Sequence, residues 1–535
     1  MAPTLPRIDL CMDDLERLVD RTRQAPLTAD EHATLKAAID TLGYLAHLVE
    51  QKGTTLDGLR QLLFGATTEK TRDVLARAGV DAPRAPRDDG PDHDPGGHGR
   101  HGVAAYSGAR QVPVAHAQLQ HGDRCPVCPT GKVYRQRDPG VLIRLVGQAP
   151  IMATVYALEK LRCHLCGELF TADPPAGVGA EKYDATTGAM VALLKYGSGM
   201  PFHRLERLQA NLEIPLPAST QWEIVAETAT RLQPALAELT RQAAQGELVH
   251  NDDTPMTVLA LGRPGAPDDD ADLAPDRTGV FTSGIVSTGE GHRIALFLTG
   301  RRHAGENLAQ VLAARAAELG PPIQMCDALT RNLPQPLAVI LGNCLAHARR
   351  RFVEVTPSFP AECRHVLETL REVYRHDADA RAQGLGPQDR LAWHQAHSGP
   401  LMDDLQAWLT AQIDAHGVEP NSGLGQAIAY LRHHWTPLTL FLRQPGAPLD
   451  NNICERALKR AILHRKNALF YKTLAGAHVG DLFMSLIHTC ELAEANPFDY
   501  LTALQRHTDA LVATPSAWMP WNYRDTLAAA ALDSG

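Results

Sequence analysis

Runs of apolar and β-branched residues follow one another closely between residues 246 and 345. The first three are ELVHNDDTPMTVLA, GVFTSGIVSTG and HRIALFLTG, and each has the length and composition of a β-strand. A helical pattern over 304–318 comes next, then the strand-like PIQMC and AVILGN, and then another helix. Three strands followed by alternating helices and strands predict an α/β sheet over residues 246–355.

Helical periodicity dominates on both sides of this sheet, over residues 183–245 and 361–445. Within the first block, residues 201–229 predict a helix, a Pro-containing turn and a second helix capped by Ser219. This pattern fits a helix-turn-helix that reads DNA. An ordinary helical hairpin has the same pattern, so both interpretations remain open.

The N-terminal part of the chain predicts a helix over residues 28–64. Five apolar residues recur there every seven positions, which permits a coiled coil. They are Leu35, Leu42, Val49, Leu56 and Leu63. The second apolar seam is poor, so a helix or helical pair packed on its own domain is an equal alternative. Residues 82–102 are rich in Pro, Gly, Asp and His and predict a flexible linker.

Length and composition indicate a water-soluble protein of several modules. A chain of 535 residues exceeds what one ordinary core accommodates, and its 44% apolar and 21% charged residues are typical of globular proteins. No apolar run reaches the roughly 18 residues of a membrane span, and the first residues carry acids where a signal peptide has bases. We therefore expect a cytoplasmic location and no membrane partner.

The formal net charge of −9 argues by itself against a nucleic-acid-binding protein. The charges are unevenly spread, however. Acids are concentrated in two predicted loops, 88–94 and 268–276, whereas bases cluster in HARRRF (347–352) and KRAILHRK (459–466). Because salt screens charges beyond about 10 Å, these local clusters matter more than the total.

Two CxxC pairs stand out among the ten cysteines. Cys125 and Cys128 form the first, and Cys163 and Cys166 the second. Each pair places two thiolates on one tight turn, and two such turns complete a tetrahedral site suited to Zn²⁺. A redox CxxC is the rival interpretation, but two flanked by turn residues favour structural zinc.

Three acidic positions suggest a second kind of metal site. NDDTP (251–255) ends the first predicted strand, Asp327 ends the fourth, and Glu455 begins a later helix. Such acids meet in a ribonuclease-H-like sheet, where clustered carboxylates need Mg²⁺ to offset their repulsion. Two purely structural roles are the alternatives to metal binding. An Asp at a strand end often forms a turn, and Glu455 closes a capping box if Asn452 caps the helix.

The sequence resembles the insertion-sequence-66 family of bacterial transposases. The matching stretches run in the family order over nearly the whole chain, and the most specific contains DNN, ER and RKN. They are LLFGATTEK (62–70), the paired CxxC, NDDTP, NCLAHARRRF (343–352), LDNNICERALKRAILHRKNALF (449–470), LFMSLIHTCE (482–491) and MPWNYR (519–524).

The resemblance implies a multidomain α+β protein with a ribonuclease-H-like catalytic domain of Asp-Asp-Glu type. An all-helical insertion then separates the second acid from the third. The expected parts are an N-terminal helical or coiled-coil region (1–81), a linker (82–110), a zinc-binding module (111–180), a helix-turn-helix-like region (181–245), the catalytic core (246–360 and 446–500), the helical insertion (361–445) and a C-terminal tail (501–535).

Carried over by position, the resemblance makes Asp252, Asp327 and Glu455 the catalytic acids, with neighbouring Asp253 an alternative for the first. Two Mg²⁺ ions, or Mn²⁺ in their place, are the implied cofactors. Cys344 and His347 match a Cys-x-x-His signature that supports the active site in related transposases, although a core histidine is an equal alternative for His347. One departure is visible: Asp327 precedes Ala-Leu, where the family often has Gly-Tyr or Ala-Tyr.

Basic residues follow Glu455 along the same predicted helix. Lys459 lies one turn further on and can pair with Glu455 or contact a phosphate. We expect Arg460, Arg465 and Lys466 to contact the DNA backbone, although a solvated basic surface has the same pattern.

Together these features predict a transposase that binds terminal inverted repeats and target DNA, cuts one strand and joins the new 3′-hydroxyl to the target. Holding two DNA ends requires a homo-oligomer, and the resemblance also implies two small accessory proteins. The alternatives are a catalytically inactive DNA-binding protein derived from a transposase and a metal-dependent nuclease without strand transfer.

Overall fold

The computed structural model describes residues 28, 31, 32, 35, 36, 70–77, 114–115, 117–127, 130–135, 148–162, 169–179, 181–262, 277–415 and 417–533. The chain divides into two compact units. The smaller comprises residues 1–82 and 356–364, and the larger comprises the rest. In the smaller unit, helix α3 (Thr71–Arg77) buries Val74 and Leu75.

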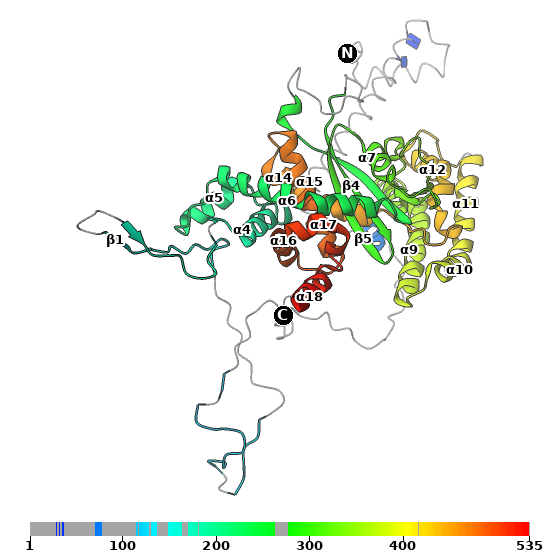
Figure 1. The fold of residues 1–535 in the computed structure, drawn as a ribbon. Coiled ribbons are helices and arrows are strands. Elements are labelled where there is room, and N and C mark those ends of the chain that lie inside the picture. The colour runs from blue at the N-terminus through cyan, green and yellow to red at the C-terminus, as the bar shows by residue number, and fades with distance from the viewer. Residues whose placement is uncertain are drawn as a thin grey trace. The chain divides into compact units, whose positions relative to one another are not determined.

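A five-stranded mixed sheet is the centre of the larger unit (Figure 1). The strand order is β5-β4-β3-β6-β7, with β5, β4 and β3 antiparallel and β3, β6 and β7 parallel. This arrangement confirms the predicted α/β sheet and is compatible with a catalytic domain of Asp-Asp-Glu type. The bounds are β3 (Leu248–Pro255), β4 (Phe281–Gly289), β5 (His292–Gly300), β6 (Ile323–Cys326) and β7 (Ile340–Asn343).

Helices α7 (Ala304–Leu312) and α14 (Asn452–Ala468) cover opposite faces of this sheet. Asn307 of α7 donates to the hydroxyl of Ser283 at 2.8 Å. The thiol of Cys454 in α14 donates to the carbonyl of the next residue, Gly284, at 3.2 Å. A side chain at Gly284 would press on Leu458 of α14. Because successive side chains of a strand point to opposite faces, the two helices lie on different sides.

Helix α15 (Leu474–Leu492) caps the free edge of the sheet. The backbone N–H groups of Ala295, Phe297 and Thr299 in the edge strand β5 donate to Thr489, Ser485 and Asp481 respectively, at 2.7 to 3.1 Å. Alternate strand residues recur about every 6.8 Å and every fourth helix residue about every 6 Å, so the two repeats match. Hydrogen bonds that a further strand would make are therefore supplied by side chains.

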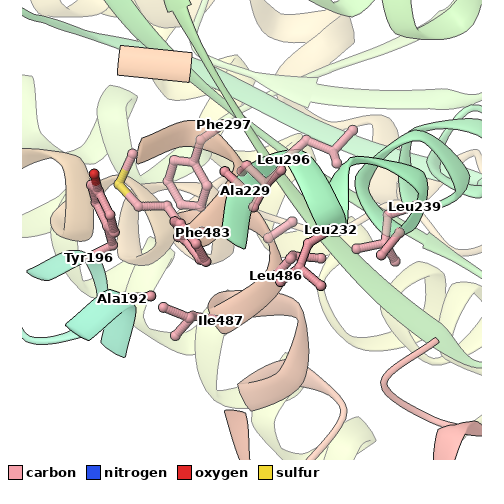
Figure 2. Packing of buried hydrophobic residues seen from close by; sticks show 14 of the residues in the cluster. Ala192, Tyr196, Ala229, Leu232, Leu239, Leu296, Phe297, Phe483, Leu486 and Ile487 are labelled. Carbon is pink, nitrogen blue, oxygen red and sulfur yellow. The ribbon is translucent and has the colours of Figure 1, made fainter. Parts of the chain in front are cut away.

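The main core forms where α15 packs on the long helix α6 (Ala218–Ala243) and on β5. Phe483 of α15 stacks on Tyr196 at 5.3 Å between ring centroids, and Leu232 of α6 lies in the same cluster (Figure 2). Helices of the expected region 181–245 thus share one core with the sheet. They are α4 (Ala185–Ala192), the π-helical turn η2 (Leu193–Gly197), α5 (Phe202–Asn211) and α6.

The predicted helix–turn–helix pattern corresponds to α5, a turn and α6, but Ser219 is not the cap. Helix α6 begins at Ala218, with Pro217 as the residue before it, so Ser219 lies within the first turn. Buried residues recur along α6 from Gln221 to Ala243. An ordinary helical pair and a helix-turn-helix both allow this packing, so DNA reading by α6 stays a prediction.

Helical segments fill the predicted insertion between the sheet and α14, and α10, α11 and α12 lie together (Figure 1). Asp377 of α9 is buried and accepts hydrogen bonds from Arg390 and His394 of α10. The bounds are α8 (Leu345–Val355), α9 (Pro360–Ala382), α10 (Pro387–His397), α11 (Gly399–Asp414), α12 (Gly423–His433), α13 (Trp435–Leu438) and the 3₁₀ turn η5 (Leu440–Leu442).

We expected residues 501–535 to form a tail, but the described part, 501–533, is mostly helical and contributes buried side chains. Trp518, Met519 and Tyr523 are buried, and the Tyr500 hydroxyl donates to the Trp518 carbonyl at 2.9 Å. Met519 and Tyr523 of MPWNYR therefore belong to the core. The helices are α16 (Pro497–Arg506), α17 (Thr508–Ala513), η6 (Pro515–Trp518) and α18 (Tyr523–Asp533).

Several predictions fall largely outside the described residues. Of the N-terminal helix only a few positions are described, including Leu35, which is helical. The linker 82–102 and Cys128, Cys163 and Cys166 lie outside as well. Short strands do flank the second CxxC, since β1 (Lys160–Arg162) pairs antiparallel with β2 (Leu169–Thr171). No helix among the described residues is long and apolar enough to cross a membrane.

Candidate active site

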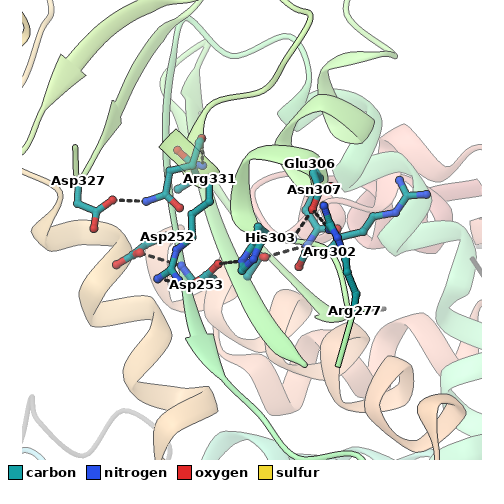
Figure 3. A network of polar contacts seen from close by, with 12 residues as sticks. Asp252, Asp253, Arg277, Arg302, His303, Glu306, Asn307, Asp327 and Arg331 are labelled. Atoms are coloured by element: carbon teal, nitrogen blue, oxygen red, sulfur yellow. Dashed lines mark hydrogen bonds and ion pairs between the residues drawn. The ribbon is translucent and has the colours of Figure 1, made fainter. Parts of the chain in front are cut away.

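Asp252 and Asp327 belong to neighbouring parallel strands. Leu248 of β3 pairs with Ile323 of β6, and the same offset of 75 residues separates Asp252 from Asp327, directly after the last residue of β6. Neighbouring strands lie about 4.8 Å apart, so the register alone brings the two carboxylates together. Figure 3 shows both side chains at this edge of the sheet.

Asp253 points to the other face of β3. Its carboxylate is fully buried and contacts His303 Nδ1 at 2.9 Å and Arg331 at 3.2 Å (Figure 3). Two basic side chains therefore hold Asp253, whereas Asp252 faces other acids. Of the two alternatives for the first acid, the geometry supports Asp252.

Glu455 reaches the same region from the first turn of α14, and its side chain is 29% exposed. The capping-box interpretation is wrong, because the residue preceding the helix is Asn451 and the Asn451 side chain makes no cap hydrogen bond. Instead, the Asp450 carboxylate accepts from the backbone N–H of Asn452 at 3.1 Å. Glu455 is thus free of any capping role.

The three carboxylates influence one another electrostatically. Burial raises the pKa of Asp252 to about 7, and the negative charges of Asp327, Asp253 and Glu455 contribute to this rise. Burial also raises the pKa of Asp327, although the positive charges of His347 and Arg331 oppose it. An uncompensated group of acids of this kind is the arrangement that a divalent cation stabilises.

Buried amides fix the segments that carry the acids. Asn251 donates from its side chain to the Asn332 carbonyl at 2.8 Å and accepts from Gln324 of β6 at 2.8 Å. The Asn332 side chain donates in turn to the carboxylate of Asp327. Asn451 donates to the Asn251 carbonyl at 3.1 Å, which joins the start of α14 to β3.

The sequence alone assigned no role to these amides, although Asn251 and Asn451 lie within motifs quoted above. Asn251 and Asn451 precede the proposed acids, and Asn332 ends CDALTRN. An Asn within an apolar strand was the available signal, since a buried amide needs partners. A neighbouring glycine has a similar structural reason: a side chain at Gly305 of α7 would collide with the backbone of residues 331–333.

Cys344 and His347 lie beside Glu455, as the predicted supporting role requires. His347 Nε2 is 3.7 Å from Glu455 Oε1, and the Cys344 thiol accepts from the Asn451 backbone N–H at 3.3 Å. Burial raises the pKa of Cys344 to about 11. His347 is about a quarter exposed, so it is not a core histidine.

The four predicted DNA-contacting residues of α14 differ in their surroundings. Lys459 and Lys466 are exposed, and no ion pair joins Lys459 to Glu455 within the described chain. Arg465 donates to the Thr254 hydroxyl at 3.2 Å, close to the end of β3. Arg460 donates to the Gly197 carbonyl and pairs with Glu491. Because its guanidinium links α14 to η2 and α15, we do not retain Arg460 as a DNA contact.

One member of the predicted zinc site is described. Cys125 is of intermediate exposure and lies next to an antiparallel bridge between Arg124 and Lys132. With its three partners outside the described residues, the four-cysteine site stays a prediction.

Comparison with known proteins agrees with this architecture. A family model described as "Transposase IS66 family" matches residues 182–479, which is more than half of the chain. The protein y4jD of Sinorhizobium fredii (strain NBRC 101917 / NGR234) is 33% identical over 189 residues, covering 34% of this chain and about a third, 36%, of y4jD. The protein y4hP of the same strain is 25% identical over 412 residues, covering 69% of this chain and 68% of y4hP. Both carry the description "Uncharacterized protein". Because the matched family region contains the whole sheet, the helical insertion and α14, the chain belongs to the IS66 family of transposases.

Proposed function

We propose that this protein is a DNA transposase of Asp-Asp-Glu type, in which Asp252, Asp327 and Glu455 are the catalytic acids. The observation that carries the proposal is their convergence from three distant segments. Asp252 lies on β3, Asp327 directly follows the parallel strand β6, and the charges of Asp327 and Glu455 help to raise the pKa of Asp252. The strand order and the helical insertion support a ribonuclease-H-like catalytic domain.

The residues present fit Mg²⁺, because carboxylate oxygens are the ligands that this ion prefers. Asp252, Asp327 and Glu455 would hold two such ions, with Mn²⁺ a substitute. Bound there, the ions would supply the Lewis acidity for phosphodiester cleavage and for attack by the resulting 3′-hydroxyl on target DNA. The chain's own contribution is to fix the acids, through Asn332 on Asp327 and Asn451 at the start of α14.

DNA would lie along the exposed side of α14. Lys459 and Lys466 project there, seven residues apart and so on the same side of the helix, and Arg465 lies near the end of β3. Cationic side chains beside the acids offset the repulsion between phosphates and carboxylates. A homo-oligomer that holds two DNA ends, accessory proteins from the same element and a structural zinc in the four-cysteine module belong to this proposal.

The test is a joining reaction with the purified full-length chain. A labelled duplex carrying the inverted repeats that flank the gene is mixed with a supercoiled plasmid and Mg²⁺. We expect nicked and joined products from the parent chain and none from Asp252→Asn or Glu455→Gln. A matched control is Asp403→Asn, which removes an exposed acid from α11 in the insertion.

Three other outcomes of the joining reaction would contradict the proposal. Full activity of the Asp252 and Glu455 variants would refute the assigned acids. Cutting without joined product would identify a nuclease, and DNA binding without either reaction would identify an inactive DNA-binding relative.

A further inference from the structure

Three metal-ligating atoms from two helices converge beside the proposed acids. The Cys344 thiol, one ring nitrogen of His347 and one carboxylate oxygen of Glu455 all lie within 4.8 Å of one another. Cys344 directly precedes α8, and His347 follows three residues later, so both face the same side. Glu455 approaches them from the first turn of α14.

The spacing is that of ligands around an ion and not that of a hydrogen bond. His347 Nε2 and Glu455 Oε1 are 3.7 Å apart, beyond hydrogen-bonding distance. A His nitrogen and a Glu oxygen on a tetrahedral Zn²⁺, with bonds of about 2.0 to 2.2 Å, lie about 3.3 to 3.6 Å apart. A small movement of the Glu455 side chain would complete this geometry.

Hydrogen bonds hold Cys344 in place, whereas the second ring nitrogen of His347 has no hydrogen-bond partner among the described residues. The backbone N–H of Cys344 donates to the Cys326 carbonyl at 2.9 Å, and the Cys344 thiol accepts from the Asn451 N–H at 3.3 Å. His347 Nδ1 is buried and has no hydrogen-bond partner among the described residues. The imidazole is therefore not fixed by the protein alone.

We propose that Cys344, His347 and Glu455 bind a transition-metal ion of the Zn²⁺ class, at a site that shares only Glu455 with the Mg²⁺ site. A thiolate and an imidazole select Zn²⁺, Co²⁺ or Fe²⁺ over Mg²⁺, which prefers oxygen ligands only. Binding releases the thiol proton to solvent. Three protein ligands leave a fourth position for water.

Glu455 belongs to both groups, and its carboxylate would have to move toward Cys344 and His347 to ligate Zn²⁺. Occupation by Zn²⁺ withdraws Glu455 from Asp252 and Asp327. If the proposed function holds, Zn²⁺ therefore inhibits the Mg²⁺-dependent reaction. This consequence rests on the proposed function, whereas metal binding itself does not.

The direct test is Co²⁺ titration of the metal-free full-length chain, followed by the thiolate-to-cobalt absorption band. All variants carry Cys125→Ser and Cys163→Ser, which disable the predicted four-cysteine module. We expect one Co²⁺ per chain with a thiolate band in this background. Cys344→Ser is expected to abolish the band, and His347→Gln to weaken Co²⁺ binding by at least about tenfold.

Asp252→Asn is the matched control and is expected to keep the band, because Asp252 is not among the three ligands. His347→Gln also guards against misfolding, since His347 is partly exposed and its replacement is tolerated more easily than that of buried Cys344. Absence of the band in the background protein, or its persistence in both ligand variants, would overturn the proposal.

A second arm measures strand cleavage at fixed Mg²⁺ with increasing Zn²⁺. We expect inhibition of the background protein, and we expect His347→Gln, compared with its own rate without Zn²⁺, to need at least about tenfold more Zn²⁺ for the same fractional inhibition. Active protein that is insensitive to Zn²⁺ would refute the inhibitory role. A chain that binds Co²⁺ as expected yet cuts no DNA would refute the proposed function and leave the metal site standing.

Discussion

Asp252 and Asp253 are neighbours in sequence, yet they face opposite sides of β3 and have opposite electrostatic surroundings. Asp253 lies between His303 and Arg331, whereas the charges near Asp252 are those of other carboxylates. Loss of charge should therefore affect folding stability in opposite directions at the two positions.

We expect Asp253→Asn to lower the free energy of unfolding by about 1–3 kcal/mol, because the buried Asp253 carboxylate is the shared partner of His303 and Arg331. Asp252→Asn should leave stability unchanged or raise it, because it removes a repelled charge. Urea denaturation at pH 8 without divalent ions measures both. If Asp252→Asn proved more destabilising than Asp253→Asn, the two side chains would have to lie on the opposite faces of β3 from those described.

The raised pKa of Asp252 predicts how stability depends on pH. In the metal-free folded protein this carboxyl keeps its proton up to about pH 7, whereas its ordinary pKa is 3.8. The folded state therefore binds the proton more tightly, and the contribution of Asp252 to stability is greatest below pH 4 and is lost as the pH rises to 7. The buried acid Asp481, whose pKa is also raised to about 7, acts in the same direction.

Comparison of the parent chain with Asp252→Asn isolates the Asp252 effect from that of Asp481. We expect the variant's relative stability to increase between pH 4 and pH 8, by on the order of 1–3 kcal/mol. Saturating Mg²⁺ at pH 8 should stabilise the parent more than the variant. A pH-independent difference between the two would contradict the raised pKa.

The Asn451 side chain joins the start of α14 to β3, so its loss is expected to have a large effect on stability. Its side chain donates to the Asn251 carbonyl and contacts His250 Nδ1 at 3.0 Å, with all three residues buried. Asn451→Ala should cost about 2–3 kcal/mol in unfolding free energy, since buried polar groups lose their partners. Asn452→Ala, at the next and half-buried position, is the matched control and should cost less than about 1 kcal/mol. Equal costs at the two positions would refute the role of the amide network.

The capped sheet edge provides a further stability prediction. Ser485→Ala removes the acceptor of the buried Phe297 N–H and should lower the unfolding free energy by about 1–3 kcal/mol. Ser219→Ala is the control on α6, where the serine is exposed and does not cap the helix, and should change stability by less than about 0.5 kcal/mol. Thermal denaturation of the two variants and the parent chain measures both effects. A large loss at Ser219 would restore the capping interpretation.

The sheet was predictable because its strands carry local signals, whereas contacts between distant segments were not. The three antiparallel strands appear where apolar runs predicted them. The helix expected over 304–318 ends at Leu312, because Arg315 donates to the carbonyls of Ala244 and Gly246, 69 to 71 residues earlier. No local pattern reveals such a partner.

The acids themselves were predictable from motif and spacing, but their supporting residues were not. Alternation along a strand shows that Asp252 and Asp253 face opposite sides, yet only the packing of α7 and α14 shows which side is which. The helix begins at Asn452 because the Asp450 carboxylate, and not a side chain of Asn452, accepts the first backbone N–H of α14. Glu455 is therefore the fourth residue of the helix. The burial of residues 518–523 likewise depends on contacts with distant helices.

The exposed lysines of α14 predict the salt dependence of DNA binding. If Lys459 and Lys466 each neutralise one phosphate, replacing either by Gln should reduce the slope of log Kd against log salt by about 1. Affinity for end DNA and unrelated DNA should fall together, because phosphate contacts carry no sequence information. Arg371→Gln, which removes an exposed cation from α9, is the control and should leave the slope unchanged. Fluorescence anisotropy over a range of salt concentrations measures all three, and unchanged slopes for both lysine variants would place the DNA on another surface.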